Sequence, residues 1–205
     1  MPILKIDQPA ERWDQLFAPS SCLAMITTVD AQGRVNAGSF GTCTRVCHNP
    51  VYIAFTAGTA KDTARNVIET GQFTVNLPRH DREILESVCV VSLPFERGVD
   101  ELERAGLTAL PSKLVRPPRI EECARHFECE VEWTREWSGR LMIVGKVLAV
   151  SIDADCIDEH GLIVWENARP SHYCGRPYGS SFVAAWNKTD VSVPYDGPEA
   201  LLFNV

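Results

Sequence analysis

Hydrophobic and polar residues alternate along several short stretches of the chain, as they do in strands that bury one face. The alternation is strictest over residues 127–135, where Phe, Cys, Val and Trp are separated by Glu and Thr. Turns are predicted at 30–33 and 137–139, and Gly145 marks a bulge or a bend. Strands are also predicted from Arg34 onward and over the apolar, β-branched stretches 21–29, 51–56, 73–77 and 141–152.

Helical patterns are confined to short segments between these strands. The first, residues 9–17, opens on proline and places its large apolar residues on one face. For a second helix over 61–70, Thr59 and Asp62 fit a capping box, and Gly71 fits the left-handed position after the last turn. Another helix is predicted over residues 80–90.

Residues 92–118 interrupt this pattern with several prolines and glycines among charged residues. We expect a surface excursion with a short helix near 99–105, placed where it covers an active-site mouth. The chain ends in the apolar stretch 200–205, which is expected to dock on its own domain or on a partner subunit.

About seven strands with few helices predict an all-β domain with peripheral helices. The sequence lacks the regular β-α-β alternation of a dinucleotide-binding domain and contains no G-x-G-x-x-G motif. An antiparallel barrel, closed or partly closed, is the natural way to pair such strands. We therefore expect one domain over residues 1–205.

Charge and cysteine content narrow the class of protein. A formal net charge of −7 argues against a nucleic-acid or anionic-membrane partner, which requires clustered positive charge. No run of about 18 apolar residues is present, and the first residues lack the apolar core of a secretory signal. We expect a cytoplasmic protein whose eight cysteines are mostly small buried residues and not disulfides.

The stretch 36–44 carries candidate chemistry, because it is rich in glycine and hydroxyl residues where the preceding strand is expected to end. A polar loop there allows a ligand close to the backbone. The helix that begins at Lys61 offers free N–H groups to a phosphate, and Thr63 and Asn66 complete the shell. These features predict a cradle for a phosphorylated heterocycle, although an ordinary helix cap explains the same residues.

The chain resembles the flavin reductase-like, FMN-binding split-barrel family, in its flavoredoxin-like branch. The resemblance covers roughly residues 15 to 180. It rests on a series of short motifs in order: Asn36-Ala37-Gly38-Ser39-Phe40, Asn49-Pro50, Lys61-Asp62-Thr63 with Asn66, residues 71–78, residues 128–131, residues 143–147, residues 158–161, and Arg169-Pro170 with Tyr173 and Gly175.

This resemblance implies a Greek-key-like split β-barrel that binds FMN (FAD is also possible) at the interface of a homodimer. It implies a phosphate near Lys61 and an isoalloxazine ring over residues 39–44. Family members use NADH or NADPH to reduce flavin, or pass electrons from bound FMN to an acceptor. The implied cofactor-binding residues are Asn36, Ser39, Phe40, Thr42, Cys43, Thr44, Lys61, Asp62, Thr63, Asn66, His172 and Tyr173.

Alternatives remain open at this point. Cys43, Cys47 and His48 resemble a haem attachment motif only loosely, because this chain has one residue too many between the two cysteines. A zinc site would require a second cysteine pair. We therefore predict no metal site, and we interpret Cys43 as a packed residue in preference to a redox group. The protein is predicted to be an oxidoreductase without a named catalytic acid or base; an FMN-binding electron carrier without turnover and a flavin-free interaction barrel are the alternatives.

Overall fold

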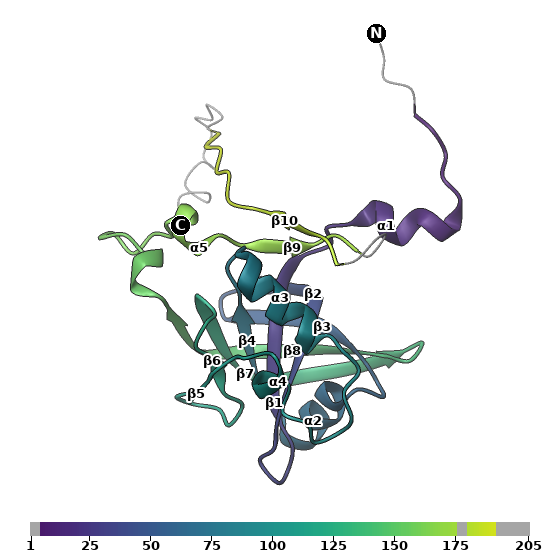
Figure 1. Cartoon of the computed structure of the whole chain (residues 1–205), viewed down its shortest axis with the longest axis vertical. Helices are drawn as coiled ribbons and strands as arrows, with labels where there is room; N and C mark the ends of the chain where they lie inside the picture. Colours follow the sequence, from purple (N-terminus) through teal and green to yellow (C-terminus); the bar gives the residue numbers. More distant parts are fainter. Residues whose placement is uncertain (1–4, 176–179, 192–205) are drawn as a thin grey trace.

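The structure, a computed structural model, describes residues 5–175 and 180–191 (Figure 1). Six antiparallel strands close into a barrel, because β4 returns to pair with β1 on the side opposite β2. Around the barrel the strands run in this order: β1 (Cys22–Val29), β2 (Val35–His48), β3 (Val51–Gly58), β8 (Arg140–Ile152), β7 (Arg125–Trp137) and β4 (Gln72–Leu77). Strands β1, β2 and β3 form a meander, and β4 returns to lie beside β1, which is the Greek-key arrangement. The predicted fold class is therefore confirmed.

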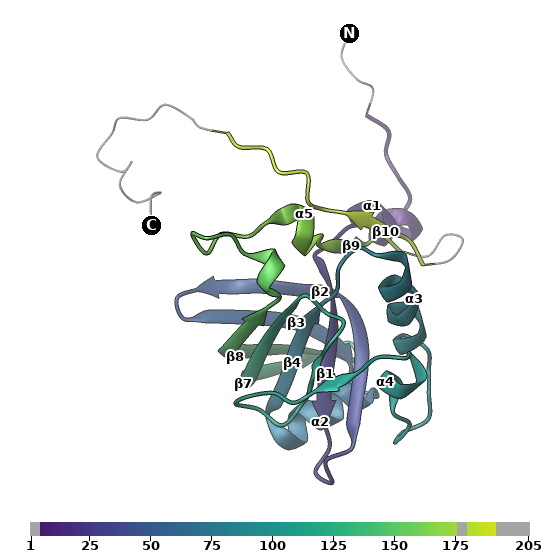
Figure 2. The same ribbon diagram turned by 60° about the vertical axis from the view of Figure 1, so that its left-hand side comes forward.

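Short elements cover the outside and the two ends of the barrel. Figure 2 shows α1, β9 and β10 together at one end, α2 at the other, and α3 and α4 along one side. The elements outside the barrel are η1 (Ala10–Arg12), α1 (Trp13–Phe17), α2 (Asp62–Thr70), α3 (Arg82–Val91), α4 (Glu101–Arg104), β5 (Ala109–Leu110), β6 (Arg119–Ile120), η2 (Ala154–Cys156), α5 (Trp165–Ala168), β9 (Ser171–Tyr173) and β10 (Phe182–Ala184). None of the described helices is long and apolar enough to cross a membrane.

Most of the core lies in two clusters, and a small third cluster contains Ala124, Cys156 and Ala168. One fills the barrel, where the rings of Phe40, Phe55 and Phe73 meet edge to face in succession, with centroids 5.0 and 5.1 Å apart. The second large cluster lies between the barrel wall and helices α3 and α4, where Leu85 and Leu102 pack against Met25 and its neighbours. The predicted strands therefore bury one face inside the barrel, and several bury the other under α3 and α4.

Two sequence expectations about the site region are wrong. Residues 36–44 do not form a loop, because β2 continues through them and pairs with β1 as far as Cys43. Thr59 does not cap α2: its hydroxyl donates to the Gly139 carbonyl at 3.2 Å, and the first residue before α2 is Lys61, without a side-chain cap. The left-handed Gly71 after α2 is confirmed.

The outer parts of the chain also depart from expectation. The apolar face predicted for residues 9–17 is not buried, since the three large side chains of α1 are exposed. The short helix of the excursion is confirmed as α4, and the turn at 137–139 is confirmed. The apolar stretch 200–205 lies outside the described residues.

The barrel is split on one side, and the split positions the candidate site. β2 pairs with β3 only from Thr44 to His48, although it pairs with β1 along most of its length. Residues 36–42 of β2 therefore present a strand edge that no described strand covers on that side. Unpaired backbone groups at such an edge must find other partners.

Gly145 owes its place to packing inside the barrel. Gly145 pairs with Val131 of β7, where the register shifts between Val131 and Trp133. The bulge predicted at Gly145 is therefore in β7 and not in β8. A methyl group on Gly145 would overlap the buried ring of Phe73.

We expect Gly145→Ala to lower the free energy of unfolding by about 1–3 kcal/mol, because Phe73 is fully enclosed and has no space to move into. Urea denaturation measures the change. Gly58→Ala is the matched control, since its new methyl group meets only the flexible Lys61 side chain at 3.4 Å. Equal losses in the two variants would contradict the packing explanation.

Candidate functional site

A cavity of about 500 Å³ opens where β2 separates from β3. This volume falls in the range of small-molecule and cofactor sites. We call it the main cavity. Its walls are residues 36–42 of β2, 56–58 of β3, 61–63 at the start of α2, 91–95 after α3, Glu101 of α4 and Arg140 of β8.

The β2 edge supplies backbone groups to the main cavity. The Ala37 N–H donates to the Glu101 carboxylate at 3.1 Å and not to β1. Because N–H and C=O groups alternate sides along an antiparallel strand, the backbone of Ser39 faces the same side as that of Ala37. Thr42 partly covers the edge, since its hydroxyl accepts the Thr56 N–H at 3.2 Å. The stretch around Ser39 is therefore available to hydrogen-bond a ligand.

The start of α2 supplies positive potential. Lys61 is exposed, α2 begins without a side-chain cap for its first N–H groups, and the residues that carry those groups line the main cavity. Asp62 would oppose an anion there, but it is ion-paired with Arg65 at 3.4 Å and with Arg97 at 3.8 Å. The helix start therefore suits an anionic group.

A buried polar network holds α2 against β1 and β2. Asn36 donates to Thr28 at 3.2 Å and to Thr63 at 3.1 Å, and Asn66 donates to Thr28 at 3.1 Å. The Asn66 side-chain oxygen is buried without a hydrogen-bond partner. This network fixes where the helix start lies relative to the β2 edge.

Glu101 is a buried carboxylate at the cavity wall, only 8% exposed. Burial raises its pKa, and the hydrogen bond from Ala37 offsets part of that rise. Asp62 and Asp100 raise the pKa further. Glu101 therefore links the excursion to β2 through the Ala37 N–H. Its carboxyl group is also more readily protonated than that of a surface glutamate.

A second cavity of about 450 Å³ shares a wall with the main cavity. The shared residues are Ser39, Phe40, Gly41, Ser92 and Arg140. On its far side, the rings of Tyr173 and Phe182 pack edge to face with centroids 5.8 Å apart. The two cavities form one hollow with a polar, cationic part and an aromatic part.

Most of the residues predicted from the sequence line this hollow. Those in the main cavity are Asn36, Ser39, Phe40, Thr42, Lys61, Asp62 and Thr63, and Tyr173 lines the second cavity. The predicted residues that line neither cavity are Cys43, Thr44, Asn66 and His172.

Strand geometry explains these exceptions. Side chains alternate along β2, which turns Cys43 into the barrel core at 2% exposure. Thr44 lies where β2 already pairs with β3. Asn66 acts through the buried network, and the His172 ring is hydrogen-bonded to the Ser21 carbonyl at 2.7 Å.

Sequence reasoning missed Glu101, Arg97, Arg140 and the segment 91–95. Arg140 begins β8 immediately after the hairpin turn, far along the chain from the β2 edge. Glu101 and Arg97 belong to the excursion, whose expected role as a cover pointed to the region but not to individual residues. Only tertiary contacts place them.

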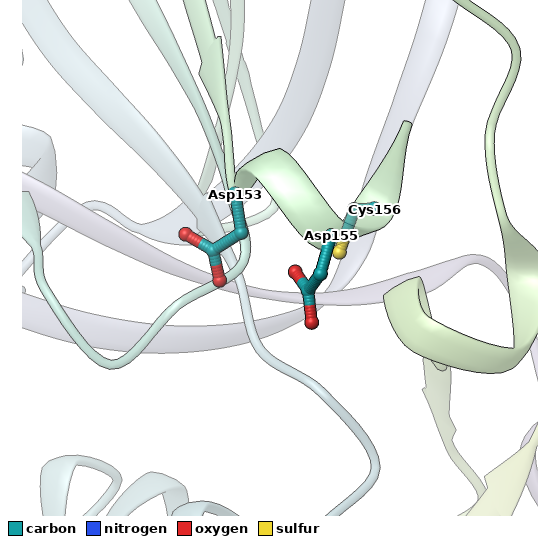
Figure 3. A group of neighbouring side chains, drawn as sticks. All are labelled: Asp153, Asp155 and Cys156. Atoms are coloured by element: carbon teal, nitrogen blue, oxygen red, sulfur yellow. The ribbon is translucent and has the colours of Figure 1, made fainter. Parts of the chain in front are cut away.

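One cluster outside the hollow has the composition of a metal site. Figure 3 shows Asp153, Asp155 and Cys156 pointing toward a common space. The guanidinium of Arg79 occupies that space, 3.0 Å from Asp153, 2.8 Å from Asp155 and 3.3 Å from the Cys156 sulfur. The cluster is therefore an arginine-centred ion-pair network.

Comparison with known proteins gives matches that cover most of the chain. Residues 19–176 match the family described as flavin reductase like domain. An uncharacterized protein from Halalkalibacterium halodurans is 34% identical over 77% of this chain and 79% of its own, and YwrF, an uncharacterized protein from Bacillus subtilis, is 30% identical over 76% and 81%.

Solved structures share the fold. The 2-nitrobenzoate 2-nitroreductase NbaA from Pseudomonas fluorescens superposes with a TM-score of 0.79, at 23% identity, over 94% of this chain and 96% of its own. Nitrilotriacetate monooxygenase component B from Bacillus cereus gives 0.78 at 22% identity, covering 93% and 100%. Flavoredoxin from Desulfovibrio vulgaris gives 0.73 at 21%, covering 86% and 91%. At these identities the likeness shows the fold alone.

The raised pKa of Glu101 predicts a pH-dependent effect of its replacement. Ionisation is disfavoured in the folded state, so stability is lost as the pH rises from the ordinary pKa of 4.5 through the raised folded value. Glutamine keeps an oxygen for the Ala37 N–H and carries no charge. We expect Glu101→Gln to be more stable than the parent protein at about pH 7 and to lose that advantage at about pH 3.

Urea unfolding at both pH values tests this. Glu103→Gln, on the exposed side of the same helix, is the control and is expected to change little at either pH. A stability difference for Glu101→Gln that is the same at both pH values would show that ionisation is not its cause.

Proposed function

Because the chain belongs to the flavin reductase like domain family and is a flavin-related oxidoreductase, we propose that it binds FMN and passes electrons from NADH or NADPH to a flavin, a small acceptor or a partner protein. The observation that carries this proposal is the uncapped start of α2 at Lys61, which opens onto the same cavity as the uncovered edge of β2. The first suits a phosphate, and the second suits a planar ring with hydrogen-bonding atoms at its rim.

The residues present fit FMN. The main cavity has the volume of a cofactor site, and Lys61 forms no ion pair within the described part of the chain, so its charge is available to a phosphate. The ion pairs of Asp62 with Arg65 and Arg97 reduce its repulsion of an anion. Bound there, FMN would supply the hydride and electron-transfer chemistry of the reaction.

The chain's own part is to hold and orient the ligands. Lys61, Thr63 and the first N–H groups of α2 would hold the phosphate. The backbone around Ser39, with Thr42, would meet the rim of the ring, and Phe40 supports this wall from the core. Asn36 and Asn66 would position these groups through Thr63 and Thr28.

The second cavity is the proposed place for the nicotinamide or the acceptor. It adjoins the main cavity, so a molecule there lies next to one in the main cavity. Arg140, exposed at the boundary, suits a phosphate or carboxylate, and Tyr173 and Phe182 offer aromatic surface.

We also propose that the protein is a homodimer of the cytoplasm. All eight cysteines are free thiols, as a reducing compartment favours. Large apolar side chains are exposed at several places, which is typical of surfaces that contact another chain. They include Trp13, Leu16 and Phe17 on α1, and Trp133, Trp137, Leu148 and Val150 on β7 and β8. Light scattering tests the dimer, and a monomer mass over a range of concentrations would disprove it.

The decisive experiment is the visible spectrum of the purified protein, reconstituted with FMN and then mixed with NADH or NADPH under nitrogen. Bleaching of the bound flavin, followed by sustained NAD(P)H oxidation once excess free FMN is added as the acceptor, supports a reductase. Bound flavin that neither nucleotide bleaches favours the electron-carrier alternative, and failure to take up FMN favours the flavin-free barrel. For a reductase, Arg140→Ala is expected to raise KM for the nucleotide by a larger factor than it raises the dissociation constant of FMN, because Arg140 lies at the boundary of the two cavities.

We expect Lys61→Ala to weaken FMN binding roughly tenfold, since a charge-assisted contact of about 1.4 kcal/mol is lost. Riboflavin, which has no phosphate, is expected to bind the variant and the parent protein equally. Fluorescence titration measures both dissociation constants.

Lys146→Ala is the matched control, because it removes the same charge from an exposed position on β8 that does not line the main cavity. Equal weakening of FMN and riboflavin binding by Lys61→Ala would show that Lys61 does not contact the phosphate.

A further inference from the structure

Two cysteines face each other across neighbouring strands at one end of the barrel. Cys22 begins β1 and is the register partner of Cys43 on β2. The Cys22 thiol donates a hydrogen bond to the Cys43 carbonyl at 3.2 Å. Residues directly opposite in an antiparallel pair carry their side chains on the same face, so both thiols lie on one side of the β1–β2 ladder.

The cross-strand register of this pair is compatible with a disulfide. Opposed residues in an antiparallel ladder have Cα atoms about 4.5–5.5 Å apart. Disulfide-bonded cysteines have Cα atoms about 4.4–6.8 Å apart. These two ranges overlap, so a bond between the sulfurs requires mainly that the side chains rotate toward each other, at a strand end where the ladder is irregular between Cys22 and Ala24.

The two thiols differ in access and in charge environment. Cys22 is half-buried, whereas Cys43 is 2% exposed. Hydrogen bonding to the Cys43 thiol, opposed by burial and assisted by the Arg125 guanidinium, lowers the pKa of Cys22 to about 7. The same contact and burial raise the pKa of Cys43. Cys22 is thus the accessible nucleophile, and Cys43 is the thiol held next to it.

Arg125 adds an independent geometric observation. Its Nε is buried and has no hydrogen-bond partner, and no carboxylate pairs with its guanidinium among the described residues. Burial lowers the Arg125 pKa, and Cys22 and Cys156 oppose that shift. A partly buried cation without a carboxylate partner is compensated when a nearby thiol ionises.

We propose that Cys22 and Cys43 form a redox-active thiol pair that hydrogen peroxide converts to a reversible disulfide. The Cys22 thiolate attacks one peroxide oxygen, an S–O bond forms as the O–O bond breaks, and hydroxide leaves and takes up the proton that Cys22 released. The Cys43 sulfur then attacks the Cys22 sulfenic acid, the S–S bond forms as the S–O bond breaks, and water leaves with the Cys43 proton. Two thiols and one peroxide give one disulfide and two waters.

The other buried cysteines do not compete for this role. Burial raises the pKa of Cys123, of Cys129 and of Cys156, which makes their thiols less reactive at neutral pH. Cys129 packs in the same core cluster as Cys43, so it is the informative control for a nearby thiol that is not the register partner of Cys22. The pair is independent of FMN binding, since neither side chain lines the main cavity.

The experiment uses the reduced full-length protein with and without one equivalent of hydrogen peroxide, followed by alkylation and non-reducing peptide mass mapping. We expect a peptide that joins Cys22 to Cys43 and that dithiothreitol dissolves. Cys43→Ser is expected to leave a Cys22 sulfenic acid that dimedone traps, and Cys22→Ser to abolish peroxide consumption at this site. Cys129→Ser is expected to form the bond as the parent protein does.

A linkage of Cys22 to any other cysteine, or dimedone trapping of Cys22 in the parent protein without a Cys43 linkage, would overturn the proposal. So would an unmodified Cys22 after peroxide treatment. The result for the parent protein decides the matter even where a variant folds poorly, because the linked peptide is sought in the unaltered chain.

Discussion

The pairing of β2 with β3 stops at Thr44, and the candidate site depends on that stop. If the two strands paired along their full length, the barrel would be closed on this side. The N–H and C=O groups of residues 36–42 would then be hydrogen-bonded to β3. Instead the edge of β2 faces a cavity. The split therefore converts a structural strand into a ligand-binding surface without interrupting its pairing with β1.

An uncovered strand edge is costly unless its polar groups find partners. Here side chains from other elements do part of this work. Glu101 accepts the Ala37 N–H, and Thr42 accepts the Thr56 N–H across the gap. The excursion that carries Glu101 is therefore part of the site wall as well as a cover. The backbone groups left between these contacts are the ones that a bound ring can satisfy.

The buried network around Thr28 links this edge to the start of α2. Asn36 and Asn66 converge on one hydroxyl, and Thr63 joins through Asn36. Hydrogen bonds inside a core are directional, so they fix the helix start relative to β2 more precisely than apolar packing alone. The proposed phosphate and ring contacts then lie on rigid elements, which is what orienting a cofactor requires. The Cys22–Cys43 pair lies on β1 and β2, outside the main cavity, where Cys43 is part of the barrel core and Cys22 packs against it.

The strands, the short helices and the all-β class could be predicted from the sequence, because hydrophobic alternation and turn residues are local signals. Its motifs also indicated the family and the two halves of the site, at residues 36–42 and at Lys61. Tertiary structure decided what local signals cannot carry. It showed that residues 36–44 are a strand edge, since strand or loop there depends on whether β1 and β3 pair with it. It also brought in Glu101, Arg97 and Arg140 from distant segments, and it turned Cys43 away from the cavity toward Cys22, because strand register decides which face a side chain occupies.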